Sequence, residues 1–265
     1  MDAAGVNVRR TPLRACLMIL LTVTGLASAY PASAQRLTLY DSRIQTLEPR
    51  LTESERGRVK YLAGQAAAQS IWAREGEVAM AGCTGGDFTV VGVAFGAFTV
   101  KGARQTAYLY TYCYERPGDF QGLVIVQGSA VVAHYVFVDH LSAMYAMNDV
   151  NRNGFTELVL SGGFTGQGAT EGWLEVAELG PVRRLLGQLD YDHAPQPYLD
   201  NCGAVEAGGV WSSRVIRVVP GKVPSFTQQA ISGRCGNERV ATSLGLVRPL
   251  VLKPALTGWT SAPLK

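Results

Sequence analysis

The spacing of hydrophobic and polar residues changes near Gly76. Between Thr52 and Arg74, apolar residues recur at helical spacing, and Thr52 with Glu55 has the form of a capping box. Beyond Gly76, short apolar or alternating runs are separated by glycines, as is typical of antiparallel strands. The pattern predicts a mainly β protein, with antiparallel sheets in a propeller-like or sandwich-like arrangement and one long N-terminal helix. We expect strands at Phe88–Phe98, Thr106–Glu115, Gly122–Gln127, Ala130–Val138, Glu157–Ser161, Trp173–Leu179, Val182–Leu189, Ser213–Val219, Ser225–Ile231 and Val240–Leu252.

Glycines also predict two connections between strands. Gly128-Ser129 lies between two apolar runs and predicts a tight hairpin turn. The segment from Gly162 to Gly168 is rich in glycine and follows a strand, but it lacks the lysine and the helix of a phosphate-binding loop. We interpret that segment as a flexible loop.

A run of tyrosines alternates with other residues in one expected strand. Side chains at period two share a strand face, and this run consists of Tyr108, Tyr110, Tyr112 and Tyr114, opposite Leu109, Thr111 and Cys113. An exposed row of tyrosines would form a platform for a sugar, peptide or pigment-like ligand. Ordinary packing explains the same pattern, because tyrosine favours strands and tolerates a half-exposed face.

One segment carries the spacing of a cation-binding loop. Its oxygen-bearing side chains occupy positions 1, 3, 5 and 9, with glycine at position 6: Asp149, Asn151, Asn153, Glu157 and Gly154. Alternate side chains of a tight loop point inward, and the carbonyl of Phe155 supplies one more oxygen. Such a set suits Ca²⁺, a hard cation that takes six to eight oxygen ligands. An Asx-rich turn that needs no ion is the alternative interpretation.

The segment resembles the calcium loops of FG-GAP/VCBS-type repeats, which occur in integrin-like β-propellers. It is not an EF-hand, because Leu160 occupies position 12 and a strand follows. The resemblance covers residues 149–160 and implies that the ligands are Asp149, Asn151, Asn153, the Phe155 carbonyl and Glu157. Two positions that are usually acidic are asparagine here, so we expect weak binding, at a Kd of about 10⁻⁴–10⁻³ M.

A degenerate copy of this loop lies 52 residues earlier in the chain. It aligns Gly102 with Gly154 and Gln105 with Glu157, but Ala97 and Lys101 stand where ligands are needed. We therefore expect no Ca²⁺ at this copy. A period near 50 residues would suit a four-stranded propeller blade, although two copies do not establish a propeller.

The N-terminus has the form of a cleavable secretory signal peptide. Arg9, Arg10 and Arg14 precede an apolar run that is too short to span a membrane, and Ala32-Ser33-Ala34 is a suitable cleavage site. Without residues 1–34 the chain loses three arginines and one aspartate, which lowers the formal net charge from +3 to +1. We therefore expect an exported protein that neither spans a membrane nor binds nucleic acid.

Cleavage after Ala34 would remove Cys16 and leave an even number of cysteines, namely Cys83, Cys113, Cys202 and Cys235. An even number in an oxidising compartment predicts two disulfides, with three pairings possible. Proximity in the sequence favours Cys83–Cys113 and Cys202–Cys235. The chain has no CxxC motif, and its three histidines, His134, His140 and His193, lack the spacing of a zinc or copper site.

These features divide the chain into a signal peptide (1–34), an N-terminal helical segment (35–76), a β domain with the calcium loop (77–253) and a flexible tail (254–265). The leading hypothesis is a non-enzymatic, Ca²⁺-binding and disulfide-stabilised component of the cell envelope or medium, which binds an unidentified ligand or protein. One alternative is an extracytoplasmic hydrolase acting on polysaccharide or peptide. The other is a structural subunit of an envelope assembly.

Overall fold

A computed structural model describes most of the chain after residue 35. The described residues are 36–44, 49–68, 87–114, 119–180, 183–189, 196–203, 208–253 and 260–261. All of them belong to one compact unit, Ala34–Lys265. The predicted signal peptide, residues 1–34, lies outside the described residues, and so do Cys83 and His193.

The described residues form one helix and fourteen strands, and every strand pairing is antiparallel. The helix is α1 (Glu53–Ala68). The strands are β1 (Leu37–Asp41), β2 (Thr89–Gly96), β3 (Gln105–Cys113), β4 (Asp119–Gln127), β5 (Ala130–Asp139), β6 (Leu141–Met147), β7 (Glu157–Gly166), β8 (Ala169–Glu178), β9 (Arg184–Leu189), β10 (Tyr198–Asp200), β11 (Val210–Val219), β12 (Ser225–Arg234), β13 (Ser243–Leu250) and β14 (Thr260–Ser261). The prediction of a mainly β protein with antiparallel sheets and one helix is confirmed.

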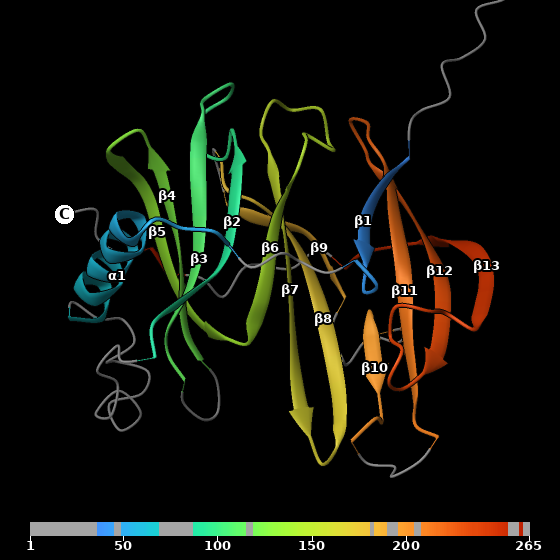
Figure 1. Ribbon diagram of the computed structural model, residues 1–265. Helices are drawn as coiled ribbons and strands as arrows, with labels where there is room; N and C mark the ends of the chain where they lie inside the picture. Colours follow the sequence, from blue (N-terminus) through green and yellow to red (C-terminus); the bar gives the residue numbers. More distant parts are fainter. Residues whose placement is uncertain are drawn as a thin grey trace, which may run out of the picture. The chain divides into compact units, whose positions relative to one another are not determined.

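The strands form two sheets. One has the order β14-β5-β4-β3-β2. The other has nine strands, in the order β13-β12-β11-β10-β8-β7-β6, with β1 paired to β11 and β9 paired to β8. Figure 1 shows β2–β5 next to α1, β6–β9 in the middle and β1 with β11–β13 beyond them.

Apolar clusters cover the faces of these groups of strands, three large ones and a small one around Trp211. The first joins residues of β2–β5, such as Leu109 and Ile125, to residues of β6–β9, such as Leu158 and Leu185. The second lies on the other face of β2–β5, beneath α1. The third joins β6–β9 to β1, β11 and the end of β13. Burial of apolar surface on both faces of the central strands stabilises this layered, sandwich-like arrangement.

Helix α1 begins at the expected cap. The Thr52 backbone N–H donates to Glu55 Oε2 at 2.8 Å, and the Glu55 N–H donates to Thr52 Oγ1 at 3.2 Å. This reciprocal pair is the predicted capping box. Val59, Ala63 and Ala66 recur at helical spacing and are buried against the β2–β5 sheet, which supplies the packing that a helix with two internal glycines needs.

Several expectations about strands and loops are wrong. Strands β1, β6 and β10 were not predicted, and the glycine-rich segment after Ser161 continues β7 as far as Gly166. It then turns at Gln167-Gly168 into β8, so it is a hairpin rather than a flexible loop. Thr260 and Ser261, in the predicted tail, pair with β5. The hairpin turn at Gly128-Ser129 is confirmed, with Gly128 at a φ of +58°.

The chain contains two matching four-stranded meanders. Strands β2, β3, β4 and β5 pair in sequence order, and β6, β7, β8 and β9 do the same. A shift of 52 residues places Gln105, the first residue of β3, on Glu157, the first residue of β7. The sequence copy is thus also a copy in strand order, and the two loops that precede β3 and β7 occupy equivalent places.

Candidate metal centre

The loop between β6 and β7 is held by its own acidic side chain. Asp149 accepts hydrogen bonds from two backbone N–H groups, those of Asn153 at 2.7 Å and Gly154 at 2.9 Å. Three loop residues adopt positive φ: Asp149 at 29°, Arg152 at 56° and Gly154 at 92°. Only glycine adopts this backbone region without strain, so Gly154 is the residue that the tight reversal requires.

Glu157 closes the loop from the start of β7. Its side chain is fully buried, and its Oε2 accepts a hydrogen bond from the Val150 N–H at 2.9 Å. The second carboxylate oxygen, Oε1, is also buried and has no hydrogen-bond partner among the described residues. An unpaired buried carboxylate oxygen is costly, so this atom marks a place where a positive charge would stabilise the protein.

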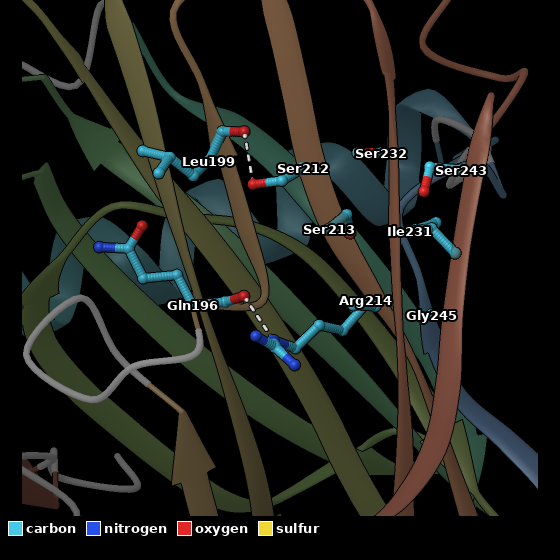
Figure 2. Close-up of a pocket in the computed structure, with 10 residues that line it drawn as sticks. Gln196, Leu199, Ser212, Ser213, Arg214, Ile231, Ser232, Ser243 and Gly245 are labelled. Carbon is cyan, nitrogen blue, oxygen red and sulfur yellow. Dashed lines mark hydrogen bonds between the residues drawn. The ribbon is translucent and has the colours of Figure 1, made fainter.

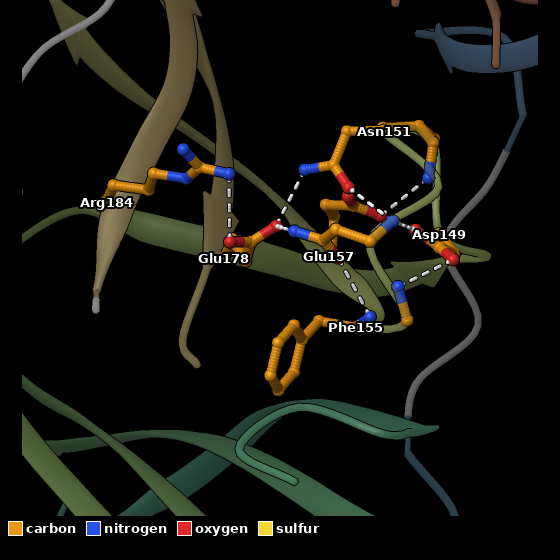
Figure 3. A network of polar contacts seen from close by, with 9 residues as sticks. Asp149, Asn151, Phe155, Glu157, Glu178 and Arg184 are labelled. Atoms are coloured by element: carbon orange, nitrogen blue, oxygen red, sulfur yellow. Dashed lines mark hydrogen bonds and ion pairs between the residues drawn. The ribbon is translucent and has the colours of Figure 1, made fainter. Parts of the chain in front are cut away.

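Glu178, at the end of β8, reaches into the same loop. Its Oε2 accepts hydrogen bonds from the side-chain amides of Asn151 at 2.7 Å and Asn153 at 2.6 Å. Its Oε1 forms an ion pair with Arg184 at 3.1 Å. Figure 3 shows Glu178 entering from the neighbouring strand towards Asn151 and Glu157, with Arg184 on its other side. The sequence analysis did not identify Glu178, although an acidic residue at the end of the apolar run Val176-Ala177 is a signal for it.

The environment of Glu157 disfavours its charged form. Burial, together with the smaller effect of the negative charges of Asp149 and Glu178, raises the pKa of Glu157 to about 7 against the lowering effect of backbone hydrogen bonds. A bound cation would oppose both causes, because it replaces lost hydration and neutralises the neighbouring charges.

The side chains of this loop are of the types that a hard divalent cation prefers. Asp149, Asn151, Asn153, Glu157 and Glu178 offer only oxygen as ligand atoms, which favours Ca²⁺ over transition metals. No group of three or more His, Cys, Asp or Glu side chains in the described part of the chain is arranged to hold a metal ion. The ligands expected from the sequence include only two carboxylates, Asp149 and Glu157, beside two amides and the Phe155 carbonyl, so they do not form such a group.

The earlier loop, residues 97–105, has the same pattern of backbone contacts but different side chains. Phe98 and Val150 are equivalent and both fully buried, and the Phe98 N–H donates to Gln105 Oε1 at 2.9 Å as the Val150 N–H donates to Glu157. Gly102 has a φ of +68°, like Gly154. The Gln105 amide nitrogen then donates to Thr99 Oγ1 at 2.7 Å and to Gln127 Oε1 at 3.1 Å. In this loop an uncharged side chain with its own donors takes the place of Glu157.

The two loops are hydrogen-bonded to each other. The Ala97 N–H donates to Thr156 Oγ1 at 2.9 Å, and the Thr156 N–H donates to the Ala97 carbonyl at 3.0 Å. Lys101 extends from the earlier loop and places its Nζ 5.3 Å from the centre of the Phe155 ring. The candidate site therefore lies beside a loop that carries an exposed positive charge.

The four tyrosines do not form an open platform. Tyr108 and Tyr110 are buried in the cluster beneath α1, and Tyr112 packs against that cluster. Tyr114 is 51% exposed. Packing therefore explains why tyrosine occupies positions 108, 110 and 112. A bulge in the β3–β4 pairing between Thr111 and Cys113 also places Cys113 in the same cluster, so the expected alternation ends there.

The cysteine and histidine expectations have separate outcomes. The Cys202–Cys235 disulfide is confirmed. Cys113 is disulfide-bonded too, but the pairing with Cys83 lies outside the described residues. His134 is buried in β5 and lies 2.8 Å from the Tyr110 hydroxyl, and burial lowers its pKa to about 4. His140 Nδ1 lies 3.2 Å from Asp119 Oδ2.

Comparison with known proteins adds no family. No protein-family model, curated protein or solved structure matches this chain. In the described residues, no helix is long and apolar enough to cross a membrane.

Proposed function

We propose that this chain is an exported, disulfide-stabilised β protein whose loop 149–157 binds Ca²⁺, and that it serves as a ligand- or partner-binding component of the cell envelope or medium. The ligands would be Asp149, Asn151, Asn153, the Phe155 carbonyl and Glu157, with Glu178 beside them. The bound Ca²⁺ would hold the junction between β6 and β7 in place.

The buried, unpartnered Oε1 of Glu157 supports the metal site. Two further carboxylates raise the pKa of Glu157, and Glu178 has only one cationic neighbour among the described residues, Arg184. The loop thus holds more negative charge than its described partners neutralise. Ca²⁺ supplies the missing charge, and extracellular Ca²⁺ is abundant enough for a weak site.

We also propose that the two meanders are successive blades of a propeller-like fold. The matching order of β2–β5 and β6–β9 and the equivalent positions of the two loops support this interpretation. Strands β1, β11, β12 and β13 pair in that order, so they provide a third four-stranded unit.

A binding role is favoured over hydrolysis at this site. Glu157 is fully buried and Glu178 is 2% exposed. A hydrolase needs its carboxylates to reach a substrate in a pocket, whereas a structural ion needs them enclosed.

The calcium site is tested by thermal unfolding of the chain from Gln35 onward, after treatment with EGTA. At a Kd of about 10⁻⁴–10⁻³ M, roughly 10 mM Ca²⁺ should add about 1.4–2.7 kcal/mol and raise Tm by about 3–10 °C. Mg²⁺ at the same concentration should give a smaller shift, because it prefers smaller and more rigid sites.

Two variants separate the site from general salt effects. Glu157→Gln should abolish the Ca²⁺ shift while changing the stability in EGTA by less than about 1 kcal/mol, because the bond to the Val150 N–H can be kept. Glu171→Gln removes a carboxylate from β8 away from the loop and should retain the full shift. An unchanged wild-type Tm, or an equal loss in both variants, would show that the loop is a turn without an ion.

A further inference from the structure

A pocket of about 650 Å³ lies on the sheet formed by β10–β13. The third apolar cluster covers Ile216 and Val218 of β11. Towards the start of β11 the same face carries Arg214 and Ser212 instead, and the sheet is open there. The pocket is therefore the uncovered continuation of a buried sheet face, and its lining combines apolar residues such as Leu199 with serines and with Arg214.

The pocket contains a positive charge, Arg214, that has no counter-ion among the residues the structure describes. Arg214 is half-buried, and its guanidinium donates to two uncharged oxygens, the Gln196 carbonyl at 3.2 Å and Gln228 Oε1 at 2.7 Å. These bonds use Nε and Nη1 and orient the guanidinium, as Figure 2 shows for the Gln196 contact. No carboxylate of the described residues pairs with Arg214, whereas Arg43 and Arg184 both have one.

Hydroxyl groups form a row beside this charge. Ser212 of β11 pairs with Ser232 of β12, and Ser232 pairs with Ser243 of β13. Directly paired side chains lie about 5 Å apart on one sheet face, so the row extends for roughly 10 Å. The hydroxyls of Ser232 and Ser243 form no hydrogen bond with another described residue. The next row is Ala230 with Gly245 beside it, which leaves room above the strands.

We propose that this pocket binds a small ligand that carries an oxyanion on a hydroxylated body, the chemistry of sugar acids and sugar phosphates. The oxyanion would accept hydrogen bonds from Arg214, whose planar fork suits carboxylate and phosphate groups. The hydroxyls of the ligand would exchange hydrogen bonds with the serine row. The site is separate from loop 149–157, so the proposal does not depend on Ca²⁺.

Isothermal titration in a phosphate-free buffer that contains about 0.15 M NaCl and EGTA tests the proposal. The probes are D-glucuronate, glucose 6-phosphate and D-glucose. Both charged probes should bind, and glucose should bind at least about tenfold more weakly, since hydrogen bonds to charged groups are worth about 1.5–3 kcal/mol. Their relative affinities identify which oxyanion fits better. Binding of glucose as tight as that of glucuronate, or no binding of either charged probe, would overturn the proposal.

Matched variants locate the binding. Arg214→Gln should weaken glucuronate binding about tenfold or more, and Arg234→Gln, the same charge change on β12 outside the pocket lining, should change it less than about twofold. Ser243→Val keeps Arg214 and lies on the exposed strand β13, so it tests the serine row even if Arg214→Gln fails to fold. A threefold or greater loss in Ser243→Val is expected. Unchanged affinity in either pocket variant, with the fold intact, would overturn the proposed pose.

Discussion

Loop 97–105 and loop 149–157 both connect the first and second strands of a four-stranded meander, and each ends on a buried polar side chain. In the earlier loop, Gln105 accepts from two backbone N–H groups, those of Phe98 and Thr99, and its amide donates to two further oxygens. In the later loop, Glu157 accepts from Val150 and leaves Oε1 unpaired.

The difference shows that loops of the same backbone arrangement can be completed by different side chains, a glutamine in one and a glutamate in the other. A glutamine has both donors and acceptors, so it completes the earlier loop from within. A carboxylate can only accept, and near Asp149 and Glu178 it lacks donors for all of its oxygens. Loop 97–105 is therefore completed by hydrogen bonds between protein groups, whereas we propose that a cation would stabilise loop 149–157.

The largest expected effect comes from removing the side chain of Gln105, which completes the hydrogen bonds of loop 97–105. Gln105→Ala leaves the N–H groups of Phe98 and Thr99 without their acceptor, and we expect it to lower the free energy of unfolding by about 2–4 kcal/mol. Urea unfolding in EGTA measures this change. Gln127→Ala, which removes only one acceptor of the Gln105 amide, should cost less than about 1 kcal/mol. Equal costs in the two variants would contradict the central role of Gln105.

The two meanders should also respond oppositely to pH. The pKa of His134 in β5 is lowered to about 4, so the stability it provides is complete above its ordinary value of 6.5 and is lost as the pH falls towards 4. The pKa of Glu157 is raised to about 7, so without Ca²⁺ its contribution is complete below its ordinary value of 4.5 and is lost as the pH rises towards 7.

The free energy of unfolding in urea, measured with EGTA between pH 4 and pH 7, tests whether the two contributions change in opposite directions. His134→Gln should reduce the loss of stability on acidification, and Glu157→Gln should reduce the loss on raising the pH. If the two variants change the pH profile in the same direction, the assignment of at least one raised or lowered pKa is wrong.

The smallest expected effect concerns the positive charge of Lys101, which loop 97–105 places beside loop 149–157. Lys101→Met keeps the aliphatic stem but removes the contact of its ammonium with the Phe155 ring, at a cost of about 0.5–1 kcal/mol. The loss of a nearby positive charge should tighten Ca²⁺ binding about twofold, since the charge is exposed and screened. Lys60→Met on the exposed face of α1 is the matched control for Ca²⁺ titration. Weaker Ca²⁺ binding in Lys101→Met would contradict the proposed electrostatic link.

The sequence predicted what depends on local patterns. The capping box of α1, the turn at Gly128 and the position of loop 149–157 all follow from a few adjacent residues. Strand β6 was missed because Leu141–Met147 contains alanine, serine and methionine in place of branched residues. Strand β10 has only three residues and is recruited by pairing with β8 and β11.

The candidate site was predicted only as far as its own loop. Glu178 comes from the end of β8, the strand that pairs with β7, and sequence spacing does not report such proximity. Burial of Tyr108 and Tyr110 depends on where α1 packs, which their period-two spacing leaves open. The bulge before Cys113 shifted that residue to the tyrosine face for the same reason: pairing between strands, not local preference, determined it.

Strand β1 has a consequence for the order in which the protein assembles during synthesis. Leu37 pairs with Val218, so the two strands are separated by about 180 residues. At synthesis rates of about 5–20 residues per second, β1 waits roughly 10–35 s for β11 to emerge. Meanwhile the strands within β2–β5 and within β6–β9 can pair with one another first, although β5 and β8 gain a further neighbour only when β14 and β10 have been made. Leu39, fully buried in the finished protein, lacks its packing partner Ile216 until then, so the first of these strands to be made is among the last to be incorporated.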